Sequence, residues 1–192
     1  MNRYTSRYQQ GETLPAMILL HPGGKGLRYL KRHIQAAEEA QIVLVACDTF
    51  RNHGPEQEYR MRFGEVLPFI KSNIRYNSKA LFMGGTSGGA WRAYHYTAWF
   101  EGPWAGVYAN GGWLGGEKYF GLDYEDGMRV AMVNGNQDGP ANRYVDIDSP
   151  ILERHDAEIA VISFEGGHQV PPTSAQTKAF QWLIQSEEFI ER

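Results

Sequence analysis

A glycine-rich turn at positions 84–89, Gly-Gly-Thr-Ser-Gly-Gly, constrains this chain of 192 residues more than any other feature. It follows an apolar run at 80–83 and precedes a stretch of helical character at 90–94. Glycines two positions before and after Ser87 permit a sharp strand-to-helix turn, because side chains there would clash with the neighbouring strand and helix. The spacing predicts a strand, a strained turn that exposes the Ser87 hydroxyl, and a helix to about residue 99. A glycine-rich turn with an incidental serine is the alternative in a chain with 22 glycines.

Short apolar runs alternate with helical periodicity along the whole chain. Continuous apolar runs separated by helices are typical of a mostly parallel sheet that is covered on both faces. The sequence therefore predicts a doubly wound α/β fold of about six strands in one domain over residues 1–192. The expected strands lie at 17–20, 42–46, 80–83, 105–109, 129–133 and 159–164. The expected helices lie at about 27–40, at 59–74 with a kink or break at Pro68, at 88–99 and at 174–185.

The composition is that of an ordinary globular protein, with 42% hydrophobic and 21% charged residues. A net charge of -3 gives no electrostatic reason to expect nucleic acid or an anionic membrane as a partner. The lone cysteine, Cys47, ends an apolar run, so we expect a buried thiol. The first 12 residues lack an apolar signal-peptide core and no run could span a membrane. We therefore expect a cytoplasmic protein, although a trimmed secreted form would have the same features.

A serine hydroxyl becomes a good nucleophile only beside a base that is itself oriented by an acid. Asp138 follows the fifth expected strand and His168 follows the sixth, in the order serine, acid, histidine. In open α/β sheets, ligands bind beyond the carboxyl ends of the strands, where these residues are expected to meet. We predict that Ser87, Asp138 and His168 are catalytic. Other carboxylates that remain possible as the acid are Asp123, Asp126 and Asp146.

A serine nucleophile also needs N–H donors for the oxyanion that forms on the attacked carbonyl. The residue after the serine, Gly88, is one candidate donor. The loop after the first strand, His-Pro-Gly-Gly at 21–24, is expected to supply the other from Gly23 or, as a second choice, Gly24. We interpret His21 as a residue that braces this loop by hydrogen bonding.

These segments resemble the α/β-hydrolase superfamily, and within it the small carboxylesterases and dienelactone-hydrolase-like members. The resemblance covers positions 20–168 and implies acyl transfer to water through a covalent acyl-enzyme. The chain departs from the larger members of the superfamily, because at most one strand fits before residue 17. It also departs from lipid-cleaving members with a cap domain, because its insertions at 47–58 and 110–128 are short. The resemblance implies a minimal α/β-hydrolase fold with an open site.

An aromatic, glycine-rich stretch at 110–120 follows the fourth expected strand. Its Trp113, Tyr119 and Phe120 are predicted to form a substrate pocket, or else to fill the gap left by missing strands. The six histidines show no metal-ligand spacing, and the expected helices place His33 and His95 on their surfaces. We predict no metal and no cofactor. The predicted partner is a small-molecule ester, with a thioester, lactone, amide or peptide substrate as the alternative. A catalytically silent binding protein is a third hypothesis.

Overall fold

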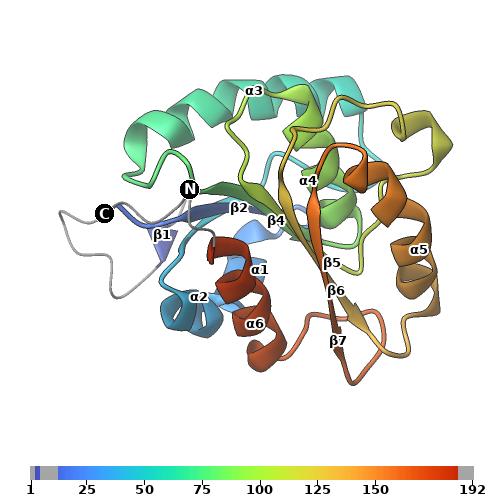
Figure 1. Ribbon diagram of the computed structural model, residues 1–192. Helices are drawn as coiled ribbons and strands as arrows, with labels where there is room; N and C mark the ends of the chain where they lie inside the picture. Colours follow the sequence, from blue (N-terminus) through green and yellow to red (C-terminus); the bar gives the residue numbers. More distant parts are fainter. Residues whose placement is uncertain (1–2, 5–12, 186–192) are drawn as a thin grey trace.

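One seven-stranded sheet forms the centre of the computed structural model, which describes residues 3–4 and 13–185 (Figure 1). The strand order is β1-β3-β2-β4-β5-β6-β7. The strands are β1 Arg3–Tyr4, β2 Ala16–Leu20, β3 Val43–Cys47, β4 Leu81–Thr86, β5 Gly106–Asn110, β6 Arg129–Gly135 and β7 Glu158–Phe164. Strands β2 to β7 are all parallel, which confirms the predicted parallel sheet of six strands. The short β1 adds an antiparallel edge beside β3.

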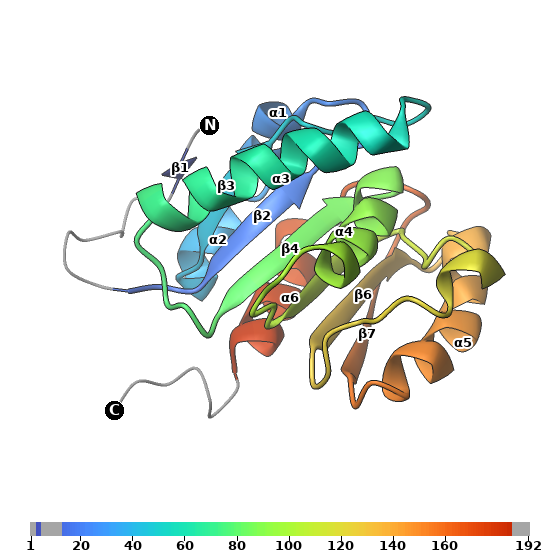
Figure 2. The ribbon, with the colours of Figure 1, turned by 90° about the horizontal axis from the view of Figure 1, so that it is seen from above.

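Helices cover both faces of this sheet, as predicted. The helices are α1 Gly26–Lys31, α2 Ile34–Ala40, α3 Glu56–Asn73, α4 Gly88–Trp99, α5 Gly139–Glu153 and α6 Thr173–Ile184, with a 3-10 turn, η1, at Glu117–Tyr119. In the view turned by 90°, α3 and α4 lie on one side of the strands and α6 lies on the other (Figure 2). Helices α1 and α2 share the α6 side, and α5 shares the α4 side.

Strand β2 shows how the two helical layers are held. Its five residues are all buried, and their side chains alternate between the faces. Ile18 belongs to the apolar cluster under α3 and α4, whereas Leu19 belongs to the cluster under α1, α2 and α6. A strand buried on both faces must be apolar throughout, which is why the continuous runs predicted the sheet correctly.

Three helical predictions need correction. The helix expected at 27–40 is divided into α1 and α2 by a turn around His33, whose ring is fully buried rather than on a surface. His95 is likewise buried, on the inner side of α4. Of the two outcomes expected at Pro68, a kink or a break, the break does not occur, because α3 continues through Pro68.

The sequence interpretation missed α5 altogether. Gly139 and Pro140 are typical of a turn, but Pro140 lies in the first helical turn, where its absent N–H would have no partner in any case. The helix buries Leu152 against the sheet.

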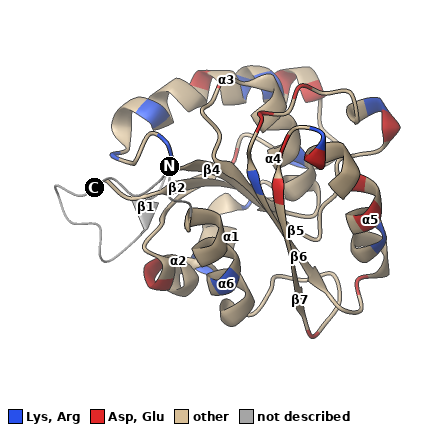
Figure 3. Ribbon diagram, in the orientation of Figure 1, with Lys and Arg blue, Asp and Glu red and all other residues tan. Residues whose placement is uncertain are grey.

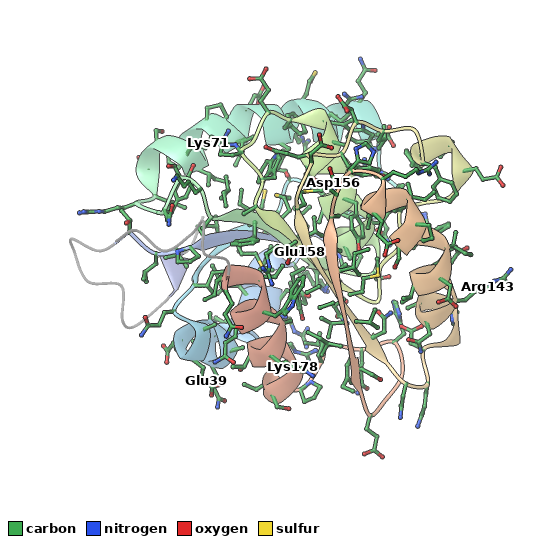
Figure 4. All side chains as sticks on the ribbon, in the orientation of Figure 1. Glu39, Lys71, Arg143, Asp156, Glu158 and Lys178 are labelled. Atoms are coloured by element: carbon green, nitrogen blue, oxygen red, sulfur yellow. The ribbon has the colours of Figure 1, made fainter. Side chains whose placement is uncertain are left out.

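Acidic and basic residues are interspersed along α3 and α5 (Figure 3). Arg143 of α5 points away from the sheet, while Glu39 and Lys178 mark the neighbouring helices α2 and α6 (Figure 4). Thr177 joins these two helices by donating a hydrogen bond to Glu39 Oε2 at 2.7 Å. Within the described residues, no helix has the length and apolarity required to cross a bilayer.

Candidate active site

Ser87 occupies the strained turn between β4 and α4. Its φ of 52° and ψ of -123° are rare for a residue with a side chain. The flanking glycines permit the turn: a Cβ on Gly85 would lie 2.4 Å from the Gly89 carbonyl carbon, and a Cβ on Gly89 would lie 2.5 Å from the Leu20 carbonyl oxygen. Strain of this kind persists where the surroundings hold it, and it is frequent at reactive residues. The turn sets Ser87 at the N-terminus of α4.

His168 and Asp138 form a close pair at the neighbouring strand ends. His168 Nδ1 lies 2.6 Å from Asp138 Oδ2. Because a carboxylate only accepts, Nδ1 carries the proton and Nε2 is left as the acceptor of the ring. The Asp138 carboxylate is buried and also accepts from the Ala141 N–H at 3.3 Å, which caps α5. The His168 ring is half exposed.

The pair is held by contacts between the loops after β6 and β7. Gln137 N–H donates to the Gly166 carbonyl at 2.8 Å, and Gly166 N–H donates to Asn136 Oδ1 at 3.1 Å. A Cβ on Gly135 would lie 2.3 Å from the Gly166 carbonyl oxygen, so only glycine allows the two loops to approach this closely. The loop that carries Asp138 is therefore fastened to the loop that carries His168.

The competing carboxylates lie elsewhere. Asp123, Asp126 and Asp146 are exposed, and Asp126 pairs with His155 at 3.4 Å. No cluster of three or more potential metal-ligating side chains occurs in the part of the chain that the structure describes.

Asn110, at the end of β5, links the Ser87 turn to the His168 loop, and the sequence interpretation assigned it no role. Its carbonyl accepts from Ser87 N–H at 2.8 Å, and its Oδ1 accepts from the Thr86 hydroxyl at 2.7 Å. Its Nδ2 donates to the carbonyls of Val133 at 3.1 Å and Gln169 at 3.2 Å. The available signal in the sequence was an asparagine directly after the apolar run at 105–109, between two strands predicted to precede site residues.

Two cavities meet at Ser87. The larger, of about 540 Å³, contains both Ser87 and the His168–Asp138 pair. Its other lining residues are Gly88, Gly111, Gly112, Trp113, Gln137, Pro140, Ala141 and Tyr144. The second, of about 440 Å³, extends from Ser87 toward the loop after β3 and is lined by more polar groups, among them Asn52, His53, Glu56 and Arg92.

The three predicted aromatic pocket residues divide into one wall residue and two core residues. Trp113 lines both cavities, and its ring packs 4.3 Å from that of Tyr144. Tyr119 is buried against His95, with ring centroids 3.9 Å apart, and Phe120 packs against the apolar cluster under α3 and α4. Neither Tyr119 nor Phe120 is among the residues that line these two cavities.

Buried titratable groups fix the backbone next to Trp113. The N–H of Leu114 donates to Asp148 Oδ2 at 2.8 Å, and its carbonyl accepts from His95 Nε2 at 2.8 Å. Burial raises the pKa of Asp148 to about 6 and lowers the pKa of His95 to about 3. His95 is therefore neutral near pH 7, and the loop that carries Trp113 is held from both sides.

Only some of the predicted oxyanion donors have a free N–H group and line the cavities at Ser87. Gly88, the first residue of α4, lines both cavities, and the first N–H groups of a helix have no acceptor within the helix. In contrast, Gly23 N–H donates to His21 Nδ1 at 3.0 Å and Gly24 N–H donates to the His21 carbonyl at 3.0 Å. Neither glycine lines the two cavities at Ser87. The bracing role expected of His21 is confirmed, and its consequence is that both glycine donors are engaged.

His21 accepts the Gly23 hydrogen bond only as a neutral imidazole. Burial, followed by the charge of Lys25, lowers the pKa of His21. The neutral form is therefore favoured, and the Gly23 N–H stays occupied at neutral pH.

Sequence comparisons find no match, either to a model of a known protein family or to a curated protein. Structural comparisons do match. A carboxylesterase of Bacillus cereus aligns with a TM-score of 0.68 and 18% identity over 88% of this chain and 87% of that chain. A carboxylesterase of Mesorhizobium loti aligns with a TM-score of 0.68 and 18% identity, over 91% of this chain and 90% of that chain. An S-formylglutathione hydrolase of Staphylococcus aureus aligns with a TM-score of 0.66 and 14% identity, over 91% of this chain and 82% of that chain. At these identities the likeness establishes architecture, and the chain has the α/β-hydrolase fold that its sequence motifs resemble.

Proposed function

We propose that this protein is a serine hydrolase that cleaves carboxylic esters through a Ser87–His168–Asp138 triad. One observation carries the proposal: a buried carboxylate orients a histidine at 2.6 Å, and this pair shares a cavity with a strained serine. The four parallel strands β4 to β7 lie side by side, and each of the three residues follows one of them. The fold shared with carboxylesterases and other serine hydrolases adds support.

In the acylation step, Ser87 Oγ attacks the ester carbonyl while His168 Nε2 accepts the hydroxyl proton. The negative charge of Asp138 stabilises the imidazolium that forms and holds the ring in the required tautomer. The carbonyl oxygen becomes an oxyanion next to the first turn of α4, where the Gly88 N–H and the helix dipole favour negative charge. His168 then gives its proton to the departing alcohol, which leaves an ester on Ser87.

In the deacylation step, a water molecule takes the place of the alcohol. His168 accepts one of its protons as the water oxygen attacks the acyl carbon, and a second oxyanion forms at the same position. Return of the proton to Ser87 Oγ releases the carboxylic acid and restores the enzyme.

The larger cavity suits the alcohol part of the substrate. The leaving oxygen must receive a proton from His168, so the alcohol group lies on the His168 side of Ser87. That side carries Trp113 and Tyr144, together with Pro140. We therefore propose aryl or other apolar alcohols as leaving groups, with the acyl group directed to the more polar second cavity.

A fluorophosphonate probe tests the nucleophile. Labelling is expected at Ser87, and Ser87→Ala is expected to lose both labelling and ester hydrolysis while keeping its fold. Ser72→Ala, at an exposed serine of α3, is the matched control and should retain both. Full hydrolysis by Ser87→Ala would refute the triad. Folded wild-type protein that is neither labelled nor active would favour a silent binding protein.

The bond that is cleaved is tested by substrate comparison. Short aryl esters, thioesters, lactones and aminoacyl amides of matched acyl groups share the same serine chemistry, so their kcat/KM values discriminate among them. We expect aryl esters to give the highest kcat/KM. A preference for thioesters or amides of at least tenfold would keep the triad and replace the ester assignment.

A further inference from the structure

The proposed mechanism needs a second oxyanion donor, and the loop after β2 does not present one. Two preorganised donors are the usual provision for a tetrahedral oxyanion. Gly88 provides one of them. The N–H groups of Gly23 and Gly24 are both engaged by His21, and neither residue lines a cavity at Ser87.

We infer that the side-chain amide of Asn52 is the second oxyanion donor. Asn52 lies in the loop between β3 and α3 and lines the second cavity together with Ser87 and Gly88. A Cβ placed on Gly88 would lie 1.9 Å from Asn52 Oδ1 and 2.8 Å from Asn52 Nδ2. The amide therefore packs directly against the backbone of the residue that supplies the first donor.

Asn52 is held in place by its backbone and is unpaired at its side chain. Its N–H donates to the Pro22 carbonyl at 2.7 Å, which ties the Asn52 loop to the loop after β2. Its Oδ1 is buried without a hydrogen-bond partner, and no described residue accepts a hydrogen bond from its Nδ2. The Asn52 side chain therefore makes no hydrogen bond within the described part of the chain, and its Nδ2 is available to donate to a bound ligand.

An oxyanion would accept from Nδ2 and would not pair with Oδ1, because the amide oxygen is itself an acceptor. Asparagine carries two N–H donors on one nitrogen, and this nitrogen has no partner in the described part of the chain until substrate is bound. The oxygen of the attacked carbonyl would lie between the Gly88 N–H and the Asn52 amide, one from the helix and one from the β3–α3 loop. Because the negative charge exists only in the transition state, the contribution of Asn52 falls on kcat rather than on KM.

This inference rests on the proposed function, and two substitutions test it. Asn52→Ala removes the amide, while Asn52→Asp keeps its size and replaces the donors with acceptors. Removing one oxyanion donor typically lowers kcat by about 10²–10³-fold, and we expect that loss in Asn52→Ala with KM changed less than about threefold. Asn52→Asp should lose at least as much. An aryl boronic acid, which forms a tetrahedral adduct on the serine, should bind both variants more weakly by a factor similar to the loss in kcat.

Control variants distinguish the proposed role of Asn52 from the proposed serine hydrolase activity. Asn73→Ala, at an exposed asparagine near the end of α3, should leave kcat unchanged, and circular dichroism should show that all variants are folded. If Ser87→Ala is inactive but both Asn52 variants retain wild-type kcat, the inference is overturned, the triad stands, and the role returns to Gly23 or Gly24. If the wild-type protein neither hydrolyses esters nor reacts with the fluorophosphonate, both the proposed hydrolase activity and the proposed role of Asn52 are wrong.

Discussion

The backbone carbonyl of Asn110 accepts a hydrogen bond from the backbone N–H of Ser87 at 2.8 Å. The same residue donates from its side chain to the carbonyls of Val133 and Gln169, the latter immediately after His168. One buried side chain at the end of β5 thus joins three neighbouring strand ends. We expect the separation between Ser87 and His168 to depend on this residue, although it contacts neither the hydroxyl nor the imidazole ring in the interactions described.

We expect Asn110→Ala to lower both activity and stability. Loss of the side chain removes the donor to the Gln169 carbonyl, one of the two donors to the Val133 carbonyl and the acceptor of the Thr86 hydroxyl. The expected cost is about 1–3 kcal/mol in the free energy of unfolding. The loop that carries His168 also loses an attachment, so kcat should fall while KM changes little. Denaturant unfolding and steady-state kinetics with an aryl ester measure the two effects.

Asn110→Asp provides the contrast. Its carboxylate would face two carbonyl oxygens, so this variant should be less stable than Asn110→Ala, although it is closer in shape to asparagine. Equal stability of the two variants would show that the side chain is not a donor to these carbonyls.

Asp138 combines two structural roles that substitution can separate. Its Oδ2 pairs with His168, and its Oδ1 accepts from Ala141 N–H as the N-cap of α5. Asparagine caps helices as well as aspartate does, so Asp138→Asn should keep the stability of the wild type. It cannot stabilise the same histidine tautomer, and a loss in kcat of roughly 10⁴-fold is expected.

Asp138→Ala should lose activity to a similar extent and also lose about 0.5–2 kcal/mol of stability, because the cap is removed. Thermal unfolding and kcat measured on both variants test this separation. An Asp138→Asn variant with nearly full activity would contradict the orienting role of the carboxylate.

The sequence predicted the parallel sheet, and the meeting of Asp138 with His168 at one edge of it, for a physical reason. Strands such as β2 and β4 are buried on both faces, so each appears as an uninterrupted apolar run. In a parallel sheet their carboxyl ends meet at one edge, so the polar residues that follow them are brought together. The closeness of Asp138 and His168 follows from this topology.

Side-chain and loop hydrogen bonds were not predictable in the same way. The engagement of Gly23 by His21 depends on the rotamer of one histidine ring, and no sequence pattern encodes it. The burial of Tyr119 depends on the path of a loop rich in glycine, where periodicity carries no information. Helix α5, which was not predicted, contains Pro150, a residue that local rules exclude from helix interiors but that tertiary packing tolerates here.

Gly111 lies directly beneath the His168–Asp138 pair. A Cβ there would lie 2.8 Å from His168 Cε1 and 3.3 Å from Asp138 Oδ2, and the φ of +55° disfavours any residue with a side chain. We expect Gly111→Ala to displace the imidazole and to reduce kcat at least tenfold, with some loss of stability.

Gly121→Ala is the matched control for this substitution. A Cβ at Gly121 would meet no atom within 4 Å, and its φ lies outside the left-handed region. This variant should keep wild-type activity and be equally or slightly more stable, because alanine restricts the unfolded chain. Wild-type activity in Gly111→Ala would mean that the pair does not depend on this close approach.

Asp148 should make the protein less stable as the pH rises above about 4. Burial raises its pKa in the folded state to about 6, from 3.8 as the ordinary value. Between these values the folded state binds more protons than the unfolded state, so the free energy of unfolding falls as pH rises, and the cost is complete above about pH 6. A shift of this size corresponds to roughly 3 kcal/mol.

Asp148→Asn removes this cost while leaving an oxygen to accept the Leu114 N–H. The variant should match the wild type near pH 4 and be more stable at pH 8, by an amount on the order of 1–3 kcal/mol. His33 and His95, whose pKa values burial lowers to about 4 and about 3, act in the opposite direction, because they must gain protons when the protein unfolds in acid. Both histidines are present in wild type and variant, so the difference between the two unfolding curves isolates Asp148. A difference that does not change between pH 4 and pH 8 would mean that this buried carboxyl titrates normally and that its burial carries no ionisation cost.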